Sequence, residues 1–247
     1  MGTKQYELDD TFPVENGYVL IPTDKEGKTF PVLYLFHGTG EDSCETWIHA
    51  GNIENNINKW ADEKYFSPMI LVFPRIKRRS QDGFKHFVEQ FSHYTDYIEK
   101  FYKPFVLQGQ ENTAVAGFSM GGAAALYCSH YYKTKFIHTA AFSPSQFVYY
   151  DGKDSWIPNS EAFDIGGTQN SINYIGYGDS EDNFARIAKR YIQYLIQQGI
   201  PINRHGLEAR VKGGHSMGTF LTLLERFIKV DIFGTNKCIP QDKIRSN

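Results

Sequence analysis

The stretch "AVAGFSMGGAAALY", residues 114–127, places a single serine between two glycines where an apolar run gives way to an alanine-rich one. Residues 112–118 are apolar enough to predict a strand buried on both faces, and residues 120–134 predict a helix. The junction between them predicts a sharp strand-to-helix turn. Such a turn needs small neighbours because the main chain on its two sides approaches closely. Ser119 stands at the tip of this turn.

Outward from this stretch, short apolar runs alternate with amphipathic ones. Strands are expected at 18–22, 31–37, 69–74, 112–118, 137–143, 172–178 and 207–213, and helices at 52–65, 85–102, 120–134, 183–199 and 217–230. Alternating strands and helices predict βαβ units and a mostly parallel sheet, hence an α/β fold. We expect one catalytic domain over residues 1–247, with a polar tail at about 235–247. The segment 144–170 is expected to be a long functional loop.

Composition argues against several classes of partner. With 247 residues and a net charge of -2, the chain has the make-up of an ordinary globular protein and no reason to bind nucleic acid or an anionic membrane. No apolar run approaches the length that spans a membrane. The three cysteines are odd in number and widely spaced, which argues against a disulfide framework or a zinc cluster. We therefore expect no metal, no cofactor, no nucleic acid and no membrane partner.

The motif around Ser119, "GFSMG", fits the pattern G-x-S-x-G. A turn of small residues without any chemistry is one explanation. The other is that the turn projects the hydroxyl above the sheet edge at a helix N-terminus, where main-chain N–H groups stabilise developing negative charge. Because the motif lies between an expected strand and an expected helix, it favours Ser119 as a nucleophile.

A serine hydroxyl is a poor nucleophile unless a base accepts its proton. Of the eight histidines, His215 is the best placed, because it follows the last expected strand in "VKGGHSMGTF". Gly213 and Gly214 form a short loop there, just before the last expected helix. His215 is therefore the expected base.

An acid that orients the base is expected between Ser119 and His215 in the chain, after the intervening strand. The stretch "YIGYGDSEDNF" ends such a strand and offers Asp179, Glu181 and Asp182. We favour Asp182, which the loop carries a few residues past the strand, with Asp179 as the alternative.

The stretch "FHGTGED", residues 36–42, follows the second expected strand and forms a glycine-rich loop. Such a loop turns a main-chain N–H toward a nucleophile. The expected oxyanion donors are the amides of Thr39 and of Met120, the residue after the serine. His37 is expected to anchor this loop.

Five motifs occur in the order and approximate spacing of the putative-esterase (esterase D-like) group of α/β-hydrolases: "PVLYLFHGTGEDSCETW", "MILVFP", "AGFSMGG", "YIGYGDSED" and "GGHSMGTF". The chain most resembles the feruloyl (cinnamoyl) esterase domains of plant-cell-wall degradation. The resemblance covers residues 15 to 232, roughly. It implies an α/β-hydrolase fold, a mostly parallel central sheet with helices on both faces.

The resemblance also implies site residues by position: Ser119 as nucleophile, His215 as base, an acid within 179–182, and the amides of Thr39 and Met120 in the oxyanion hole. Family members often place the acid three residues after the glycine that ends the strand, where this chain has Glu181. The loop here looks one residue longer, which favours Asp182. An aromatic residue often follows the histidine closely, and here it is delayed to Phe220.

The activity implied by the resemblance is that of a serine carboxylesterase acting through an acyl-enzyme intermediate. The expected substrate is a hydroxycinnamoyl (feruloyl) or acetyl ester on plant cell-wall polysaccharide, presented as a feruloylated or acetylated oligosaccharide. Trp47 and Trp156 are expected to contact that substrate, with core packing as the alternative for Trp47.

Three alternatives remain open at this point. Two are enzymes of the same family: S-formylglutathione hydrolase, or another small acyl-ester hydrolase or acyltransferase. The third is a binding module whose triad has decayed. The chain is compatible with a module of a larger polysaccharide-degrading enzyme; it would be extracellular as a cell-wall esterase and cytoplasmic otherwise.

Overall fold

A computed structural model describes residues 4–13, 17–39, 44–63, 66–75, 83–132, 135–145, 147–148, 154–155, 172–197, 199 and 209–232. Trp156, most of the segment 144–170 and the tail 235–247 lie outside these residues.

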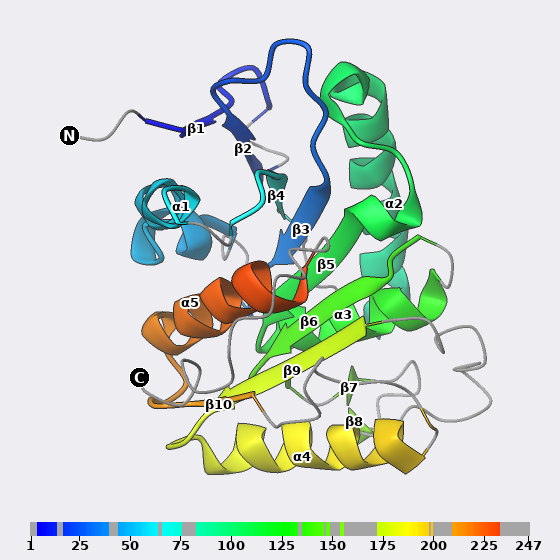
Figure 1. Ribbon diagram of the computed structural model, residues 1–247. Coiled ribbons are helices and arrows are strands. Elements are labelled where there is room, and N and C mark those ends of the chain that lie inside the picture. Colours follow the sequence, from blue (N-terminus) through cyan, green and yellow to red (C-terminus); the bar gives the residue numbers. More distant parts are fainter. Residues whose placement is uncertain are drawn as a thin grey trace.

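The strands form a central sheet that is mostly parallel (Figure 1). They are β1 (Tyr6–Leu8), β2 (Gly17–Pro22), β3 (Val32–Phe36), β4 (Ile70–Pro74), β5 (Thr113–Phe118), β6 (His138–Phe142), β9 (Ile172–Gly178) and β10 (Ala209–Val211). Their order in the sheet is β1-β2-β4-β3-β5-β6-β9-β10. β2 runs antiparallel to both β1 and β4. The remaining neighbours in the sheet, in the order β4-β3-β5-β6-β9-β10, are parallel to one another. β7 (Phe147–Val148) and β8 (Asp154–Ser155) pair separately as a short antiparallel ribbon.

Four helices connect strands of the sheet: α1 (Ile53–Ala61), α2 (Gly83–Phe101), α3 (Met120–Tyr131) and α4 (Asp182–Gln197). A further helix, α5 (Met217–Arg226), follows β10. The chain also forms short helical turns at Thr46–Ala50, Lys103–Phe105, Gln110–Asn112 and Phe227–Asp231. The predicted alternation of strands and helices is therefore confirmed, with boundaries shifted by a few residues. The edge strand β1 was not predicted, because three residues carry too little pattern.

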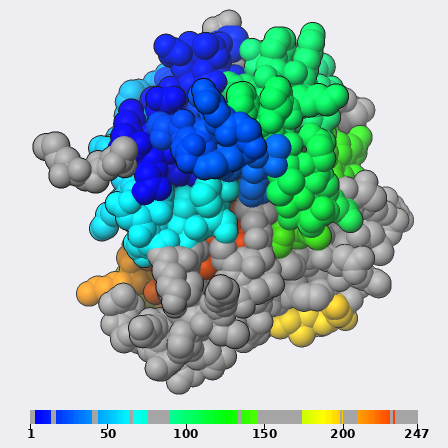
Figure 2. Space-filling view, turned by 45° about the horizontal axis from the view of Figure 1, so that its top comes forward, coloured from blue at the N-terminus to red at the C-terminus, as the bar shows by residue number. Residues whose placement is uncertain are grey.

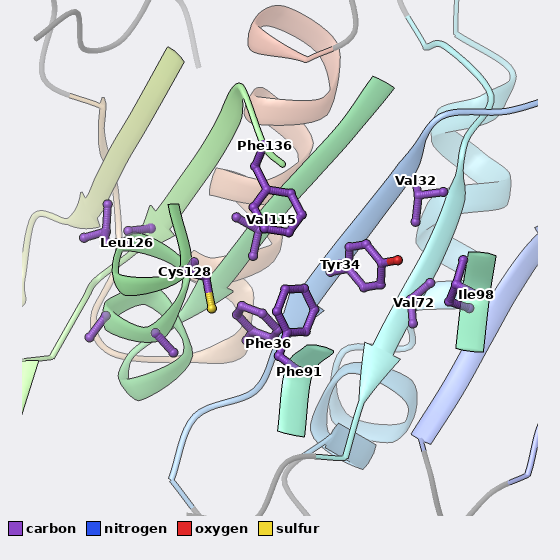
Figure 3. Close-up of a cluster of buried hydrophobic side chains, with 14 of the residues drawn as sticks. Val32, Tyr34, Phe36, Val72, Phe91, Ile98, Val115, Leu126, Cys128 and Phe136 are labelled. Carbon is purple, nitrogen blue, oxygen red and sulfur yellow. The ribbon is translucent and has the colours of Figure 1, made fainter. Parts of the chain in front are cut away.

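Alternate residues of β3 supply the two halves of the core. Val32, Tyr34 and Phe36 belong to one buried cluster, with side chains from α2 and α3 (Figure 3). Side chains from α4 complete this cluster. Leu33 and Leu35 belong to the other cluster, with side chains from α1 and α5. Because successive side chains of a strand point to opposite faces, a strand covered on both sides must be apolar throughout. The continuous apolar runs in the sequence are the consequence of this layered arrangement.

α3 packs directly on the sheet, and its residues 123–125, three alanines, are fully buried. Small side chains let the helix axis approach β5 and β6, its main neighbours. α1 and α5 lie together on the opposite side of the sheet (Figure 1). The sheet is thus covered on both faces, as in the expected fold class.

The N-terminal segment is attached to α2, and Figure 2 shows its residues, in blue, beside that helix, in green. The Phe12 ring meets Tyr97 edge-on at 5.3 Å, and the Tyr102 hydroxyl donates to the Asp9 carboxylate over 2.8 Å. Within the described residues, no helix combines the length and the apolar character needed to cross a membrane.

Candidate active site

Ser119 occupies a strained turn between β5 and α3. Its backbone angles are φ 54° and ψ -119°, a conformation that non-glycine residues rarely adopt. Flanking glycines make the turn possible, since a Cβ on Gly117 would lie 2.4 Å from the Gly121 carbonyl oxygen. A Cβ on Gly121 would lie 2.3 Å from the carbonyl oxygen of His37. The predicted strand–turn–helix junction is confirmed, and the loop after β3 passes within contact distance of it.

Main-chain hydrogen bonds to the end of β6 hold this conformation. The Ser119 amide donates to the carbonyl of Phe142, and the Ser145 amide donates to the carbonyl of Ser119, each over 2.9 Å. The Ala123 amide also donates to the Ser119 carbonyl, over 3.1 Å, which starts α3. Strain of this kind persists only where the surrounding structure over-determines it, and it is found mainly at functional sites.

The glycine-rich loop after β3 lies over the same turn. His37 is 2% exposed and its Nδ1 contacts the Gly38 carbonyl oxygen at 2.8 Å, consistent with an anchoring role in the loop. Gly38 lies against the ring of Phe118, which a Cβ would approach to 2.7 Å. Thr39 follows and is exposed, while Met120 is 5% exposed at the first position of α3. Both proposed oxyanion residues therefore lie in segments next to Ser119.

Glu181 is the carboxylate that contacts His215. Its Oε2 lies 3.6 Å from Nδ1 of His215, and its side chain is fully buried. In the described part of the chain neither Glu181 carboxylate oxygen has a hydrogen-bond partner. Glu181 directly precedes α4, and its carbonyl accepts from the Ala185 amide over 2.7 Å. The residue is thus fixed by the start of the helix.

The two acids weighed from the sequence lie elsewhere. Asp182, the favoured one, is exposed in the first turn of α4, so its carboxylate is not the one that faces the imidazole. Asp179 is also exposed and accepts a hydrogen bond from the Gly213 amide over 3.0 Å. That bond lowers the pKa of Asp179 below its usual value, with help from the Ser180 hydroxyl. Asp179 therefore ties the loop after β9 to the loop that carries the histidine.

His215 is held between two aromatic rings. The ring of Phe184 stacks on the imidazole, with centroids 3.6 Å apart and planes 9° apart. Phe220 meets it edge-on at 5.0 Å. The His215 side chain remains 31% exposed, so part of the imidazole stays open to solvent.

One of these rings, Phe220, connects the histidine to the residue before the serine. Phe220 stacks on Phe118 with centroids 4.5 Å apart and planes 14° apart, and Phe118 is the residue before Ser119. β5, β6, β9 and β10 are parallel, so the loops that follow them leave the same edge of the sheet. Ser119, Glu181 and His215 are therefore brought to one edge of the sheet by three loops.

The tryptophans predicted to contact substrate have different outcomes. Trp47 is 0% exposed, donates from Nε1 to the Phe36 carbonyl over 3.2 Å, and meets Phe118 edge-on at 5.1 Å. Trp47 therefore packs in the core beneath the turn at Ser119, which is the alternative that the sequence left open for it. Trp156 lies outside the described residues.

Two residues of this site were not selected from the sequence. Glu181 has the spacing from Gly178 that is typical of the family, but the sequence favours its neighbour Asp182. Phe184 carries no functional prediction, because a phenylalanine in an amphipathic helix usually indicates core packing. A signal for both was present in "SEDNF", where an acid and an aromatic residue stand three positions apart, the spacing of neighbours on a helix.

Solved structures of esterases share this fold. A ferulic acid esterase from Anaeromyces mucronatus, in complex with ferulic acid, is 21% identical with a TM-score of 0.68, over 88% of this chain and 85% of that one. The S-formylglutathione hydrolase of Staphylococcus aureus is 17% identical with a TM-score of 0.65, over 90% and 96%. The enterobactin esterase of Shigella flexneri is 16% identical with a TM-score of 0.65, over 92% and 58%. These likenesses establish the α/β-hydrolase fold.

The family is established by the sequence itself. A family model described as "Putative esterase" matches residues 15–224, which span most of the chain and include β2 to α5. The chain therefore belongs to the putative esterase family, and it is an ester hydrolase with the α/β-hydrolase fold.

Proposed function

We propose that this protein is a serine carboxylesterase in which Ser119 is the nucleophile, His215 the base and Glu181 the acid of a catalytic triad. The observation that carries the proposal is the buried Glu181 carboxylate against Nδ1 of His215, 3.6 Å away. That contact leaves Nε2, the other ring nitrogen, to serve the nucleophile. The strained conformation of Ser119 supports its role as that nucleophile.

Acylation begins when the Ser119 hydroxyl attacks the ester carbonyl carbon and His215 accepts the hydroxyl proton at Nε2. A C–O bond forms, the carbonyl becomes a tetrahedral oxyanion, and the imidazole becomes an imidazolium. The intermediate then collapses: the ester C–O bond breaks, and the departing alcohol takes the proton from Nε2. An acyl-serine remains.

The oxyanion is stabilised by main-chain amides. Met120 stands at the N-terminus of α3, where amides have no partner inside the helix and the helix dipole favours negative charge. Thr39 supplies the second amide from the loop after β3. Donors of this kind accelerate acyl transfer because they are oriented before the charge develops, and each is worth about 3 kcal/mol in comparable sites.

Glu181 acts on the charge that develops on the base. A buried carboxylate without hydrogen bonds is costly in the resting protein. The imidazolium that forms in the transition state gives it a counter-charge, so their attraction is greater in the transition state than in the ground state. Only interactions of that kind raise the rate of the chemical step.

Deacylation repeats the sequence with water in place of the serine. His215 takes a proton from water, the hydroxide adds to the acyl carbon, and the same amides hold the oxyanion. The bond to Ser119 Oγ then breaks, the serine regains its proton from His215, and the carboxylic acid leaves.

For the substrate, we favour a hydroxycinnamoyl (feruloyl) or acetyl ester on plant cell-wall polysaccharide. Support comes from the fold shared with ferulic acid esterases and from the order of motifs in the chain. A second candidate is the hydrolysis of small acyl thioesters, because the S-formylglutathione hydrolase shares the same fold over 90% of this chain. The fold alone does not select between these substrates.

A hydrolysis panel separates the candidates. Methyl ferulate, acetylated xylan, S-formylglutathione and a short p-nitrophenyl ester are compared by kcat/KM, with Ser119→Ala as the control for each. We expect Ser119→Ala to abolish turnover of every substrate, and methyl ferulate or acetylated xylan to have the highest kcat/KM of the natural ester classes. Near-normal turnover by Ser119→Ala would exclude the mechanism, whereas a preference for S-formylglutathione would exclude only the polysaccharide substrate.

A further inference from the structure

One face of the His215 imidazole is covered by the ring of Phe184. The two rings are nearly parallel, at 9°, and their centroids are 3.6 Å apart. Phe184 stands in the first turn of α4, three residues after Glu181. One short segment therefore supplies both the carboxylate that lies against Nδ1 and the ring that lies against the imidazole face.

Among the described residues, few charged groups surround this imidazole. Glu181 is the carboxylate in contact with it. In the adjoining segments, Asp179 accepts from a main-chain amide of the histidine loop, and Asp182 and Lys212 are exposed. From α5, on the other side, the contact is the uncharged ring of Phe220. An aromatic face and one carboxylate thus dominate the environment of the imidazole.

We propose that Phe184 is a positioning residue for His215, an inference that rests on the esterase mechanism proposed above. A parallel ring at this distance restricts rotation of the imidazole about its χ angles, and so keeps Nδ1 directed at Glu181 and Nε2 at the nucleophile. The face of an aromatic ring is also electronegative and attracts a cation. Phe184 therefore favours the imidazolium, the form of the base that exists during both chemical steps.

Substitution of Phe184 by leucine or by tyrosine distinguishes the effect of the aromatic face from the effect of merely covering the imidazole. Phe184→Leu keeps an apolar side chain over the imidazole but removes the flat π face, whereas Phe184→Tyr keeps the face. We expect Phe184→Leu to lower kcat roughly tenfold without changing KM, because the base loses its fixed orientation. The acidic limb of the pH profile of kcat/KM should move about half a pH unit lower, since the imidazolium loses its aromatic neighbour. Phe184→Tyr should stay within about twofold of the parent protein.

A matched control is available on α2. Phe101 is 55% exposed and packs against Tyr97 with centroids 4.3 Å apart, so Phe101→Leu removes a helical ring contact that involves no histidine. Phe101 ends α2, at the edge of the sheet opposite to Ser119, and its substitution should leave kcat and the pH profile unchanged.

A second measurement is the rate at which a fluorophosphonate probe labels Ser119. This rate reports how well His215 activates the serine, independently of how the acyl group of a substrate is bound. Phe184→Leu should slow this labelling by the same factor as kcat.

Each other outcome has a definite meaning. If Phe184→Leu raises KM while the acidic limb and the labelling rate stay unchanged, Phe184 lines the substrate pocket and the inference is overturned. A Phe184→Leu profile that superimposes on that of the parent protein overturns it as well. Turnover that persists in Ser119→Ala removes the proposed function and this inference together, whereas an inactive Ser119→Ala with a normal Phe184→Leu removes the inference alone.

Discussion

Oε2 of Glu181 lies 3.6 Å from Nδ1 of His215, and the Glu181 side chain is completely buried. The neighbouring Asp182 is exposed although it stands one residue later. The difference arises because α4 begins at Asp182, so the peptide before the helix directs Glu181 inward and the first helical turn directs Asp182 outward. The contact of one carboxylate with the base is therefore decided by the position of a helix start.

Exchange of the two carboxylates for amides tests this assignment. Glu181→Gln removes the charge that stabilises the imidazolium and should lower kcat by about 10³- to 10⁴-fold, as loss of a triad acid does elsewhere. Asp182→Asn, its matched control, should keep kcat within about twofold because that side chain is exposed. Steady-state hydrolysis of a p-nitrophenyl ester measures both. The reverse ranking would make Asp182 the acid.

Asp179 is predicted to stabilise the histidine loop in a pH-dependent way. Its pKa is lowered by the hydrogen bond from the Gly213 amide, so its contribution is present above the unfolded pKa and disappears as the pH falls through the folded one. Asp179→Ala should therefore unfold at a lower urea concentration than the parent protein at pH 6, and this difference should decrease as the pH falls below about 4.

Asp179→Asn is the control for this measurement, because an amide oxygen still accepts from Gly213 but does not titrate. Its urea midpoint should fall between those of the parent protein and Asp179→Ala at pH 6. A difference between Asp179→Ala and the parent protein that persists unchanged at about pH 3 would show that the carboxylate charge has no part in it.

Gly121 is predicted to be irreplaceable. A Cβ at this position would lie 2.3 Å from the carbonyl oxygen of His37, and main-chain atoms would have to move to admit it. Gly121→Ala should lower kcat at least 100-fold, because a displacement of about 1 Å at a reacting group has that effect. Gly218→Ala is the control, since its Cβ would meet no atom of the described residues within 4 Å. Gly218→Ala should retain the melting temperature and the kcat of the parent protein. An equal loss of kcat in both variants would contradict the steric explanation.

His130 is predicted to weaken the fold in acid. It is 3% exposed between α3 and α4, beside the Tyr191 hydroxyl, and burial lowers its pKa to about 4. Between about pH 6.5 and pH 4 the unfolded chain binds this proton and the folded one does not. The free energy of unfolding should therefore fall by up to about 3 kcal/mol over that range as the pH decreases.

Chemical denaturation at several pH values measures this loss. The glutamine of the His130→Gln variant cannot titrate and keeps a polar group beside Tyr191. The free energy of unfolding of this variant should therefore vary less than that of the parent protein between about pH 6.5 and about pH 4. An equally steep dependence in this variant would assign the loss to other groups.

Much of the fold and of the site follows from local sequence. Continuous apolar runs predicted strands covered on both faces, and the clusters on the two sides of β3 agree with that pattern. Glycines on either side of Ser119 predicted a tight turn, and the structure agrees, since a Cβ on Gly117 or Gly121 would lie only 2.3 to 2.4 Å from a main-chain oxygen. Patterns of this kind depend on residues close together in the chain, so they can be interpreted without the rest of the structure.

Tertiary structure decided which side chains meet. Asp179, Glu181 and Asp182 are chemically alike and lie within four positions, so only the path of the loop and the start of α4 could distinguish them. The burial of Trp47, which lies in a helical turn, depends on Phe36 and Phe118 from two different strands. The sequence by itself thus determined the sheet, the turn at Ser119 and the order of the catalytic candidates. Packing between distant segments determined which acid and which ring contact the base, because those contacts depend on directions in space that no local pattern encodes.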